Sequence, residues 1–538
     1  MKIKEMLTIF TNYMNICHNK IKTMTILTFL LTNLTFSQTI DKTKISTSNL
    51  ESHLRFLADD LLEGREAGLR GEKLAAKYIS SHFEQNNLKP LQQSNSYFQS
   101  FPLIKISVDN SSNFILSDSA KDIFRYNNFG KDFFFSSNSY DTTITEGVIF
   151  AGYGLSIPEL WNDIDTTFSY KNKILVFLTG LPKSFDSLQN KKYGFQSSAN
   201  YKRGVARRLN ASGVILISEN GKELKEAFAD QYASMLKGII RSPELPMPKD
   251  IPLVFVTNEV GQNILGGNRI YNEIITSLNS KKGITKSIYS KLTLNIKTNT
   301  TILTGENVIG FIEGSDKELK NEYIIITSHY DHVGVNLLNG NVYNGADDDG
   351  SGTVTLLELA RIISNSETKP KRSLIFMTVS GEEKGLLGSR YFVNNPLVPI
   401  NSIKANINID MIGRTDAKHD SLKQENYIYV IGSDKISKDV DSLLIFSNKK
   451  YKLNLDYTFN REEDPNRFYY RSDHYNFALK NIPVIFFFSG VHVDYHQPSD
   501  DVDKIRFDLM TERAKLIYST LINIANYPKE FKKIDLNK

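Results

Sequence analysis

A histidine and several carboxylates follow a short apolar segment in the second half of the chain. Residues 323–328 are too few for a buried helix and suit an inner strand, and they run directly into His329 and Asp331. In an extended chain, positions i and i+2 face the same way, so Asp331 is placed to orient the imidazole of His329. A glycine-rich loop with three consecutive aspartates, among them Asp348, comes next. This spacing indicates a metal site built from imidazole and carboxylate groups.

Other acidic and histidine side chains come after three further apolar segments. A single acidic residue after a strand is weak evidence for a functional site, because Asp and Glu favour turns. Several polar strand ends in one sheet converge on a single crevice, where an open α/β sheet places its site. Two histidines and several carboxylates suit zinc better than calcium or an iron–sulfur cluster. The residues are Glu382 and Glu383 after 373–379, Asp410 after 404–409, and Tyr495 and His496 after 483–488.

Length and composition limit the classes of protein to consider. At 538 residues the chain is too long for one ordinary core, so more than one domain is expected. Its 40% hydrophobic and 23% charged residues are typical of a globular protein. The net charge of +5 is small, and the basic residues are dispersed, so no nucleic-acid-binding face is indicated. The only cysteine, Cys17, excludes an intrachain disulfide and a cysteine-based zinc site.

The N-terminus is organised like a signal peptide. Two lysines precede the apolar segment 24–37, and small residues stand before a suitable cleavage point at Gln38. A buried helix or a membrane anchor is the alternative, but the segment is short for spanning a bilayer. We therefore expect an exported protein, periplasmic or secreted, with no membrane span and no cysteine after cleavage.

The rest of the chain divides into three parts by pattern. Apolar residues have helical spacing over 46–89, whereas 106–299 shows short alternating strands, with a helix at 201–210 and an exit linker at 298–301. Strands and helices then alternate, which indicates an α/β fold with a mostly parallel mixed sheet and helices on both faces. Ser351 is placed to cap the first of these helices. The predicted strands are 306–312, 323–328, 373–379, 404–409, 427–431 and 483–488, and the predicted helices are 351–364, 436–447, 473–480 and 507–526.

The ordered series of motifs resembles the M28 family of two-zinc metallopeptidases, whose aminopeptidases have a parallel-sheet α/β fold. The motifs are His329-x-Asp331, Gly345-Ala-Asp-Asp348-Asp-Gly-Ser-Gly, Glu382-Glu383, Asn408-Ile-Asp410 and Tyr495-His496. Residues 50–102, with the typical stretch Leu61-Leu-Glu-Gly-Arg65, are similar to that family's N-terminal helices, and 145–260 resembles a protease-associated domain. The resemblance divides the chain into a signal peptide (1–37), an N-terminal helical part of the peptidase domain (38–105), an inserted protease-associated domain (106–299) and an M28 catalytic domain (300–538).

The resemblance also implies a role for each site residue and two Zn²⁺ ions per chain. One ion would be bound by His329 and Asp410, the other by Glu383 and His496, with Asp348 bridging the two. Glu382 would be the general base, Tyr495 would hydrogen-bond the oxyanion, and Asp331 would orient His329. Two ions about 3.5–4 Å apart can activate a shared water, and a carboxylate that is not a ligand is needed to take its proton.

The remaining polar residues near these motifs are expected to be structural. Asp347 and Asp349 are predicted to cap their own loop, because Asx side chains commonly bond their own turn. Asp473 is predicted to cap a helix or to line the pocket. Three further histidines are not expected to be ligands: His332, His419 and His492.

The predicted function is an exported zinc-dependent aminopeptidase that releases N-terminal residues from peptide substrates. Other M28 activities are alternatives, namely a carboxypeptidase, a dipeptidase or a glutaminyl cyclase, and so is a non-catalytic binding ectodomain. All five ligand positions and Glu382 are present, which favours hydrolysis with two metals. The sequence assigns no oligomeric state.

Overall fold

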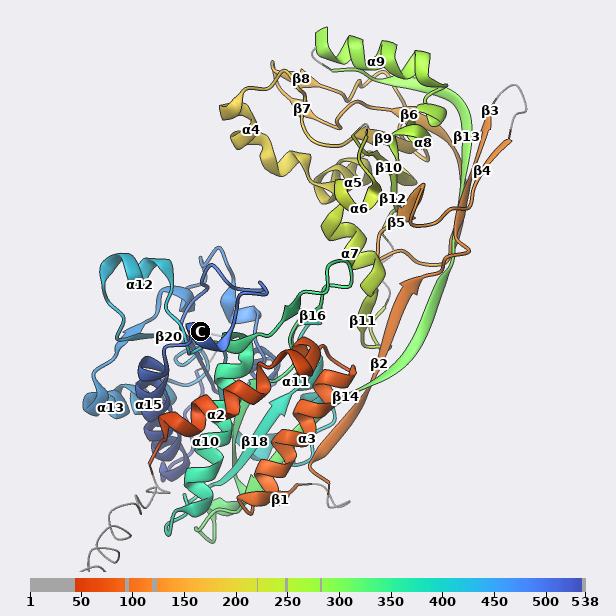
Figure 1. Cartoon of the computed structure of the whole chain (residues 1–538). Coiled ribbons are helices and arrows are strands. Elements are labelled where there is room, and N and C mark those ends of the chain that lie inside the picture. Colours follow the sequence, from red (N-terminus) through yellow and green to blue (C-terminus); the bar gives the residue numbers. More distant parts are fainter. Residues whose placement is uncertain are drawn as a thin grey trace, which may run out of the picture.

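The computed structural model describes residues 44–91, 96–118, 123–219, 221–246, 250–280 and 283–534. The predicted signal peptide, residues 1–37, lies outside the described residues. Two large sheets dominate the fold, and long strands connect them (Figure 1). Among the described residues, no helix is long and apolar enough to cross a membrane.

The larger sheet has the strand order β11-β2-β14-β18-β15-β19-β22-β20-β21, and β1 pairs with β14. Its centre is parallel, and antiparallel pairs flank that centre on both sides, so the sheet is mixed as expected. Each central strand is buried along nearly its whole length, which is typical of a sheet covered on both faces. The strands are β1 (Lys89–Pro90), β2 (Phe98–Val108), β11 (Ile239–Arg241), β14 (Thr298–Ile312), β15 (Tyr323–His329), β18 (Ser373–Val379), β19 (Ile403–Ile409), β20 (Tyr427–Ile431), β21 (Asn454–Asp456) and β22 (Val484–Phe488).

Helices cover both faces of this sheet, and the two-residue period of the strands divides the core between them. Ile324 and Ile326 of β15 pack in the cluster that contains α2, α3, α10, α13 and α15, whereas Ile325 faces the cluster of α11 and α14. These helices are α2 (Thr47–Leu57), α3 (Arg70–Gln85), α10 (Gly352–Asn365), α11 (Leu387–Asn394), α13 (Lys438–Tyr451), α14 (His474–Ala478) and α15 (Phe507–Asn526), and α12 (Ala417–Leu422) lies near β20.

The smaller sheet, with the order β4-β3-β13-β6-β9-β10-β12-β5, lies in the segment predicted to be inserted. It has an apolar cluster on each face and more helices than the sequence pattern indicates. Its strands are β3 (Asn113–Asp118), β4 (Ile123–Tyr126), β5 (Phe133–Phe135), β6 (Thr142–Phe150), β9 (Ile174–Leu178), β10 (Gly213–Ile217), β12 (Leu253–Val256) and β13 (Lys286–Ile296). Its helices are α4 (Ser187–Tyr193), α5 (Ala199–Arg208), α6 (Leu224–Ala227), α7 (Ala229–Lys237), α8 (Asn258–Ile264) and α9 (Asn268–Ser280), and α5 confirms the helix predicted over 201–210.

The two sheets are joined more closely than the predicted linker implies. Residues 298–301 are not a linker but the start of β14, which pairs antiparallel with β2 from Thr298 opposite Val108 to Val308 opposite Phe98. The segment predicted to be inserted also returns to the larger sheet, because β11 pairs with the other edge of β2. Two short hairpins complete the fold: β7 (Ser156–Ile157) with β8 (Trp161–Asn162), and β16 (Gly334–Val335) with β17 (Val342–Tyr343).

The start of α10 differs from the prediction. Ser351 does not cap the helix with its side chain. Its hydroxyl donates to the carbonyl of Asp347 and accepts from the backbone N–H of Ile412. A single π-type turn, Ala346–Ser351, precedes the helix and carries the consecutive aspartates.

Candidate metal centre

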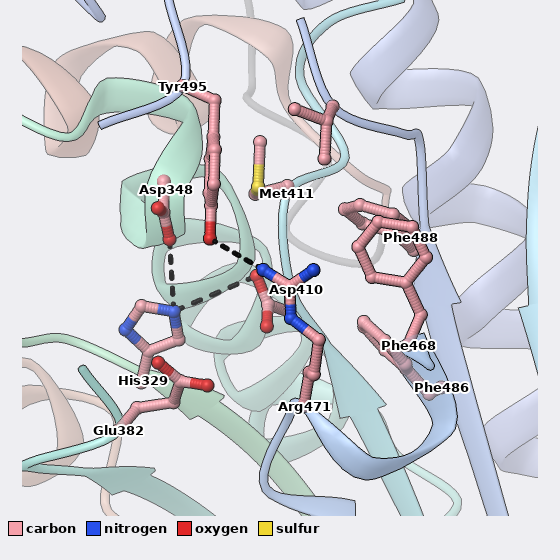
Figure 2. A pocket seen from close by; sticks show the side chains of 11 residues that line it. His329, Asp348, Glu382, Asp410, Met411, Phe468, Arg471, Phe486, Phe488 and Tyr495 are labelled. Atoms are coloured by element: carbon pink, nitrogen blue, oxygen red, sulfur yellow. Dashed lines mark hydrogen bonds and ion pairs between the residues drawn. The ribbon is translucent and has the colours of Figure 1, made fainter. Parts of the chain in front are cut away.

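The residues predicted for the site lie together at the carboxyl ends of the central strands. His329 ends β15, and Asp410 follows β19 immediately. Asp348 lies on the π-type turn that leads into α10. The other site residues come from the loops after β18 and β22, namely Glu382, Glu383, Tyr495 and His496. Figure 2 shows Asp348, Asp410 and Glu382 arranged around the ring of His329.

The first group of donor atoms belongs to His329, Asp348 and Asp410. The Nε2 atom of His329 is 3.2 Å from Oδ1 of Asp348 and 3.7 Å from Oδ1 of Asp410. Neighbouring donors on a tetrahedral zinc ion with bonds of about 2.0–2.1 Å are about 3.3 Å apart. Burial lowers the pKa of His329, but Glu382, Asp348 and Asp410 outweigh it and hold that pKa well above its usual range. This concentration of negative charge around a buried ring is the electrostatic setting of a cation site.

The second group belongs to Asp348, Glu383 and His496. The Nε2 atom of His496 is 3.0 Å from Oδ2 of Asp348 and 3.1 Å from Oε1 of Glu383. Asp348 therefore presents one oxygen to each histidine, Oδ1 to His329 and Oδ2 to His496. Within the described part of the chain, Oδ2 of Asp348, Oε1 of Glu383 and Nε2 of His496 are buried without a hydrogen-bond partner. These atoms fit a pair of metal ions that share the carboxylate of Asp348.

A third histidine, which sequence reasoning excluded, lies beside the second group. The Nδ1 atom of His332 is 3.0 Å from Oε1 of Glu383 and 3.7 Å from Oδ2 of Asp348, and its side chain is 0% exposed. The chain turns after β15 instead of continuing extended, and the backbone N–H of His332 donates to the carbonyl of Arg65. The spacing His329-x-x-His332 was the available sequence signal.

Asp331 acts on His329 through a different atom than expected. Nδ1 of His329 is 3.0 Å from the backbone carbonyl of Asp331, whereas the nearest carboxylate oxygen is 3.9 Å away. The carboxylate instead accepts from the backbone N–H of Glu382 at 3.1 Å. The expectation assumed an extended chain beyond His329, where the structure has a turn. A hydrogen bond from Nδ1–H to the carbonyl leaves Nε2 free to bind a metal.

Glu382 and Tyr495 line one pocket together with His329, Asp348 and Asp410 (Figure 2). Burial raises the pKa of Glu382 well above its usual range, and nearby carboxylates add to the effect. The hydroxyl of Tyr495 is 3.3 Å from a guanidinium nitrogen of Arg471. The opposite wall of the pocket is apolar and is formed by Met411, Phe468, Phe486, Phe488 and Val491.

A buried line of polar side chains holds Asp410 from behind. Ser472 donates to Oδ2 of Asp410 at 2.6 Å and accepts from the amide of Asn408 at 2.7 Å. Thr327 in turn donates to the side-chain oxygen of Asn408 at 2.6 Å. Oδ2 of Asp410 thus accepts the hydrogen bond from Ser472, whereas Oδ1 faces His329 and has no role in this chain of hydrogen bonds. Sequence reasoning missed Ser472, although the polar residues inside two central strands were a signal.

Arg65 fixes the two loops that carry the site histidine and aspartates. Its guanidinium is buried and donates to the carbonyls of Tyr330 at 2.8 Å, Asn344 at 2.6 Å and Gly345 at 3.0 Å, and also to that of Leu57. Burial lowers the pKa of Arg65 to about 10, against the raising effect of nearby aspartates. The stretch that ends at Arg65 therefore supports the metal centre from the N-terminal helices.

Asp347 and Asp349 mainly join their loop to neighbouring segments, whereas the prediction had them bond their own turn; only Gly352 among their partners lies in that loop. Asp349 accepts from the backbone N–H groups of Gly352, Met411 and His329 at 2.9, 3.0 and 3.2 Å. Asp347 accepts from the N–H of Gly413 at 2.6 Å.

The other polar residues lie outside the two donor groups. His492 lies 3.2 Å from the free carboxylate oxygen of Asp347, and His419 pairs with Asp416 at 2.8 Å. Asp473 does not cap α14 and instead accepts a hydrogen bond of 2.5 Å from Ser389.

The part of the chain that carries this site is similar to known peptidase sequences. Residues 307–521 match the profile of Peptidase family M28. Leupeptin-inactivating enzyme 1 of Streptomyces exfoliatus is 29% identical over 290 residues, which cover 52% of this chain and 59% of the relative. Aminopeptidase YwaD of Bacillus subtilis is 25% identical over 285 residues, which cover 50% of this chain and 55% of the relative. The chain thus spans little more than half the length of these curated relatives.

Two solved structures share the fold over nearly the whole chain. The aminopeptidase from Aneurinibacillus sp. strain AM-1 has a TM-score of 0.54 at 20% identity and covers 92% of this chain and 97% of its own. BSAP, a zinc aminopeptidase from Bacillus subtilis, has a TM-score of 0.51 at 21% identity and covers 89% and 95%. The chain therefore has the mixed α/β fold of these structures.

Proposed function

We propose that this protein, whose residues 307–521 match peptidase family M28 and which is similar to zinc aminopeptidases, is itself a zinc-dependent aminopeptidase that holds two Zn²⁺ ions. The observation that carries the proposal is the placement of Asp348, whose two oxygens face two separate histidines, His329 and His496. Asp410 and Glu383 complete the two groups of donors. Imidazole and carboxylate ligands suit zinc.

Bound zinc supplies a Lewis acid that polarises the scissile carbonyl and acidifies water. The protein's own residues supply the proton transfers and the orientation. Glu382, in the same pocket as the donor groups, accepts a proton from the attacking water and delivers it to the leaving nitrogen. Its neighbour Glu383 points at His496, so the two adjacent carboxylates divide the roles of base and ligand.

The pocket also holds groups that orient a peptide N-terminus. The hydroxyl of Tyr495, held by Arg471, donates to the oxygen of the scissile carbonyl as negative charge develops there. The carboxylates around His329 attract a free α-amino group. The aromatic wall of Phe468, Phe486 and Phe488 favours an apolar side chain at the substrate N-terminus.

The proposal includes export, on the basis of the signal-like segment that ends before Gln38. Expression in a bacterial host with an intact secretion system tests it. N-terminal sequencing of the exported protein should begin at Gln38, whereas retention of the full-length chain in the cytoplasm would contradict export.

The activity is tested with a panel of aminoacyl chromogenic substrates and the mature protein. Substrates with a free amine should be cleaved, their N-acetylated counterparts should not, and a chelator should abolish cleavage until zinc is restored. Among free-amine substrates, leucyl and phenylalanyl derivatives should be cleaved faster than glutamyl or lysyl derivatives. Cleavage of blocked substrates alone would exclude an aminopeptidase and favour another peptidase activity of the same family.

Glu382→Gln separates chemistry from metal binding. The variant should bind zinc as the wild type does and lose nearly all turnover, because a general base contributes about 10²–10⁴-fold. Metal content by mass spectrometry is the matched control. A variant that keeps both its zinc and its turnover would remove Glu382 from the mechanism.

A further inference from the structure

The second group of donor atoms has one imidazole more than the proposed function requires. His332 and His496 approach the same two oxygens, Oε1 of Glu383 and Oδ2 of Asp348. The two rings meet edge to face, with centroids 5.6 Å apart. Two histidines and two carboxylates make up the complete donor set of a closed, four-coordinate zinc site.

The distances among these donors match a tetrahedron. Neighbouring donors on a tetrahedral zinc ion are about 3.3 Å apart when the bonds are about 2.0–2.1 Å. Nδ1 of His332 lies 3.0 and 3.7 Å from the two carboxylate oxygens, and Nε2 of His496 lies 3.1 and 3.0 Å from the same two atoms. Each histidine–carboxylate edge is therefore near the length that one shared ion requires.

The ring of His332 is held at this place without hydrogen bonds of its own. Across the described residues, neither of its nitrogens has a hydrogen-bond partner, although the side chain is wholly buried. Its backbone N–H is fixed by the carbonyl of Arg65 at 3.1 Å. Gly345, at φ +56°, leaves room for the ring, since a Cβ there would lie 2.6 Å from two ring carbons. A buried imidazole held in place but without a hydrogen bond is suited to bind a cation.

We propose that His332 is a fourth protein ligand of the ion held by Asp348, Glu383 and His496. The inference rests on the proposed metal centre and makes its two sites unequal. The site with His332 has four protein donors, whereas the site with His329 has three, namely His329, Asp348 and Asp410. The first therefore binds zinc more tightly and fills first. The group with His329, which has three protein donors, would then leave room for substrate and water.

The inference is tested by X-ray absorption spectroscopy of the protein loaded with one equivalent of zinc. The spectrum should show two imidazole ligands, those of His332 and His496, at about 2.0–2.1 Å. A single imidazole per zinc would overturn the proposal. This measurement uses the unaltered chain, so it does not depend on the folding of any variant.

A variant adds a second measurement. In competition with a chromophoric chelator, His332→Gln should weaken the tighter zinc site by about 100-fold or more, because loss even of a residue that only supports a ligand costs about 10–100-fold. The weaker site should keep its affinity. His53→Gln is the matched control, since His53 lies on α2 and contacts Tyr78 rather than the metal centre. Unchanged affinity at both sites of His332→Gln would overturn the proposal.

The outcomes also separate this inference from the proposed function. If the protein binds no zinc, both fail. Two imidazoles on the first ion without chelator-sensitive hydrolysis would leave His332 as a ligand and reject the aminopeptidase. Hydrolysis with a single imidazole on the first ion would reject His332 alone.

Discussion

Replacing Arg65 with methionine should loosen the metal centre from a distance. Methionine keeps the length of the buried side chain and removes the guanidinium that donates to four carbonyls. A charge-assisted hydrogen bond contributes about 1.5–3 kcal/mol net to the free energy of unfolding. The sum over the bonds of Arg65 overstates the loss, because removing the buried charge also removes the cost of its desolvation. The change leaves four buried carbonyls without this donor at a net cost of about 1 kcal/mol each, so we expect the free energy of unfolding to fall by about 3–5 kcal/mol.

Arg65→Lys is the matched variant, because it keeps the charge and loses the planar fork. An ammonium group cannot reach acceptors on three separate segments at once. The lysine variant should therefore lose about 2–3 kcal/mol, as roughly half of the bonds remain.

Hydrogen exchange measured by mass spectrometry locates the effect. In both variants, peptides that cover 330–350 should exchange faster, since their carbonyls at Tyr330, Asn344 and Gly345 lose a donor. Peptides around Trp161, in the smaller sheet's apolar cluster, are the internal control and should not change. Equal stability of the lysine variant and the wild type, or faster exchange around Trp161 alone, would refute the reasoning.

Three further predictions concern the site and its support. Ser472→Ala should weaken zinc binding about 10–100-fold, because Oδ2 of Asp410 loses its donor, and unchanged affinity in chelator competition would contradict this role. Asp348→Asn should lower zinc occupancy at both positions, measured as metal per chain, and loss of a single ion would argue against a bridge. Burial raises the pKa of Glu72 to about 7 from its ordinary 4.5, so folding favours the protonated form and stability falls as pH rises from about 4.5 to about 7. Glu72→Gln should therefore be more stable than the wild type above about pH 7, by at most about 3 kcal/mol, and equally stable near pH 4, as judged by thermal unfolding.

The larger sheet was predictable because each of its central strands is short, apolar and bounded by turns. The segments 323–328, 373–379 and 427–431 match β15, β18 and β20 within one residue. Helices were harder to predict. The short helix α11 was missed, since its eight residues follow a loop and make only about two turns, and 473–480 was predicted longer than α14.

The site residues that lie at the carboxyl ends of strands were predictable. The residues that reach the site through a turn or from a distant segment were missed. His329 and Asp410 end or follow strands, and their meeting follows from the parallel sheet alone. His332 reaches the site because the chain bends back after β15, and the spacing His329-x-x-His332 was the local signal that was not used. Arg65 is 265 residues from Tyr330, and Ser472 is 62 from Asp410. Such partners depend on tertiary packing, which a single sequence does not encode locally.

The segment predicted to be inserted, residues 106–299, is not an independent module, because it contacts the loops that carry the candidate site. Lys237, at the end of α7, donates to the carbonyl of Val333 and lies 3.3 Å from Glu66, and α7 lies beside β16 in Figure 1. The same oxygen of Glu66 is 2.8 Å from Lys384, which directly follows Glu382 and Glu383. The carboxylate of Glu66 thus joins this segment to the loop that carries Glu382 and Glu383, and Val333 joins it to the turn that holds His332. The residues around the candidate metal centre are therefore positioned in part by this segment, whose strand β11 also belongs to the larger sheet.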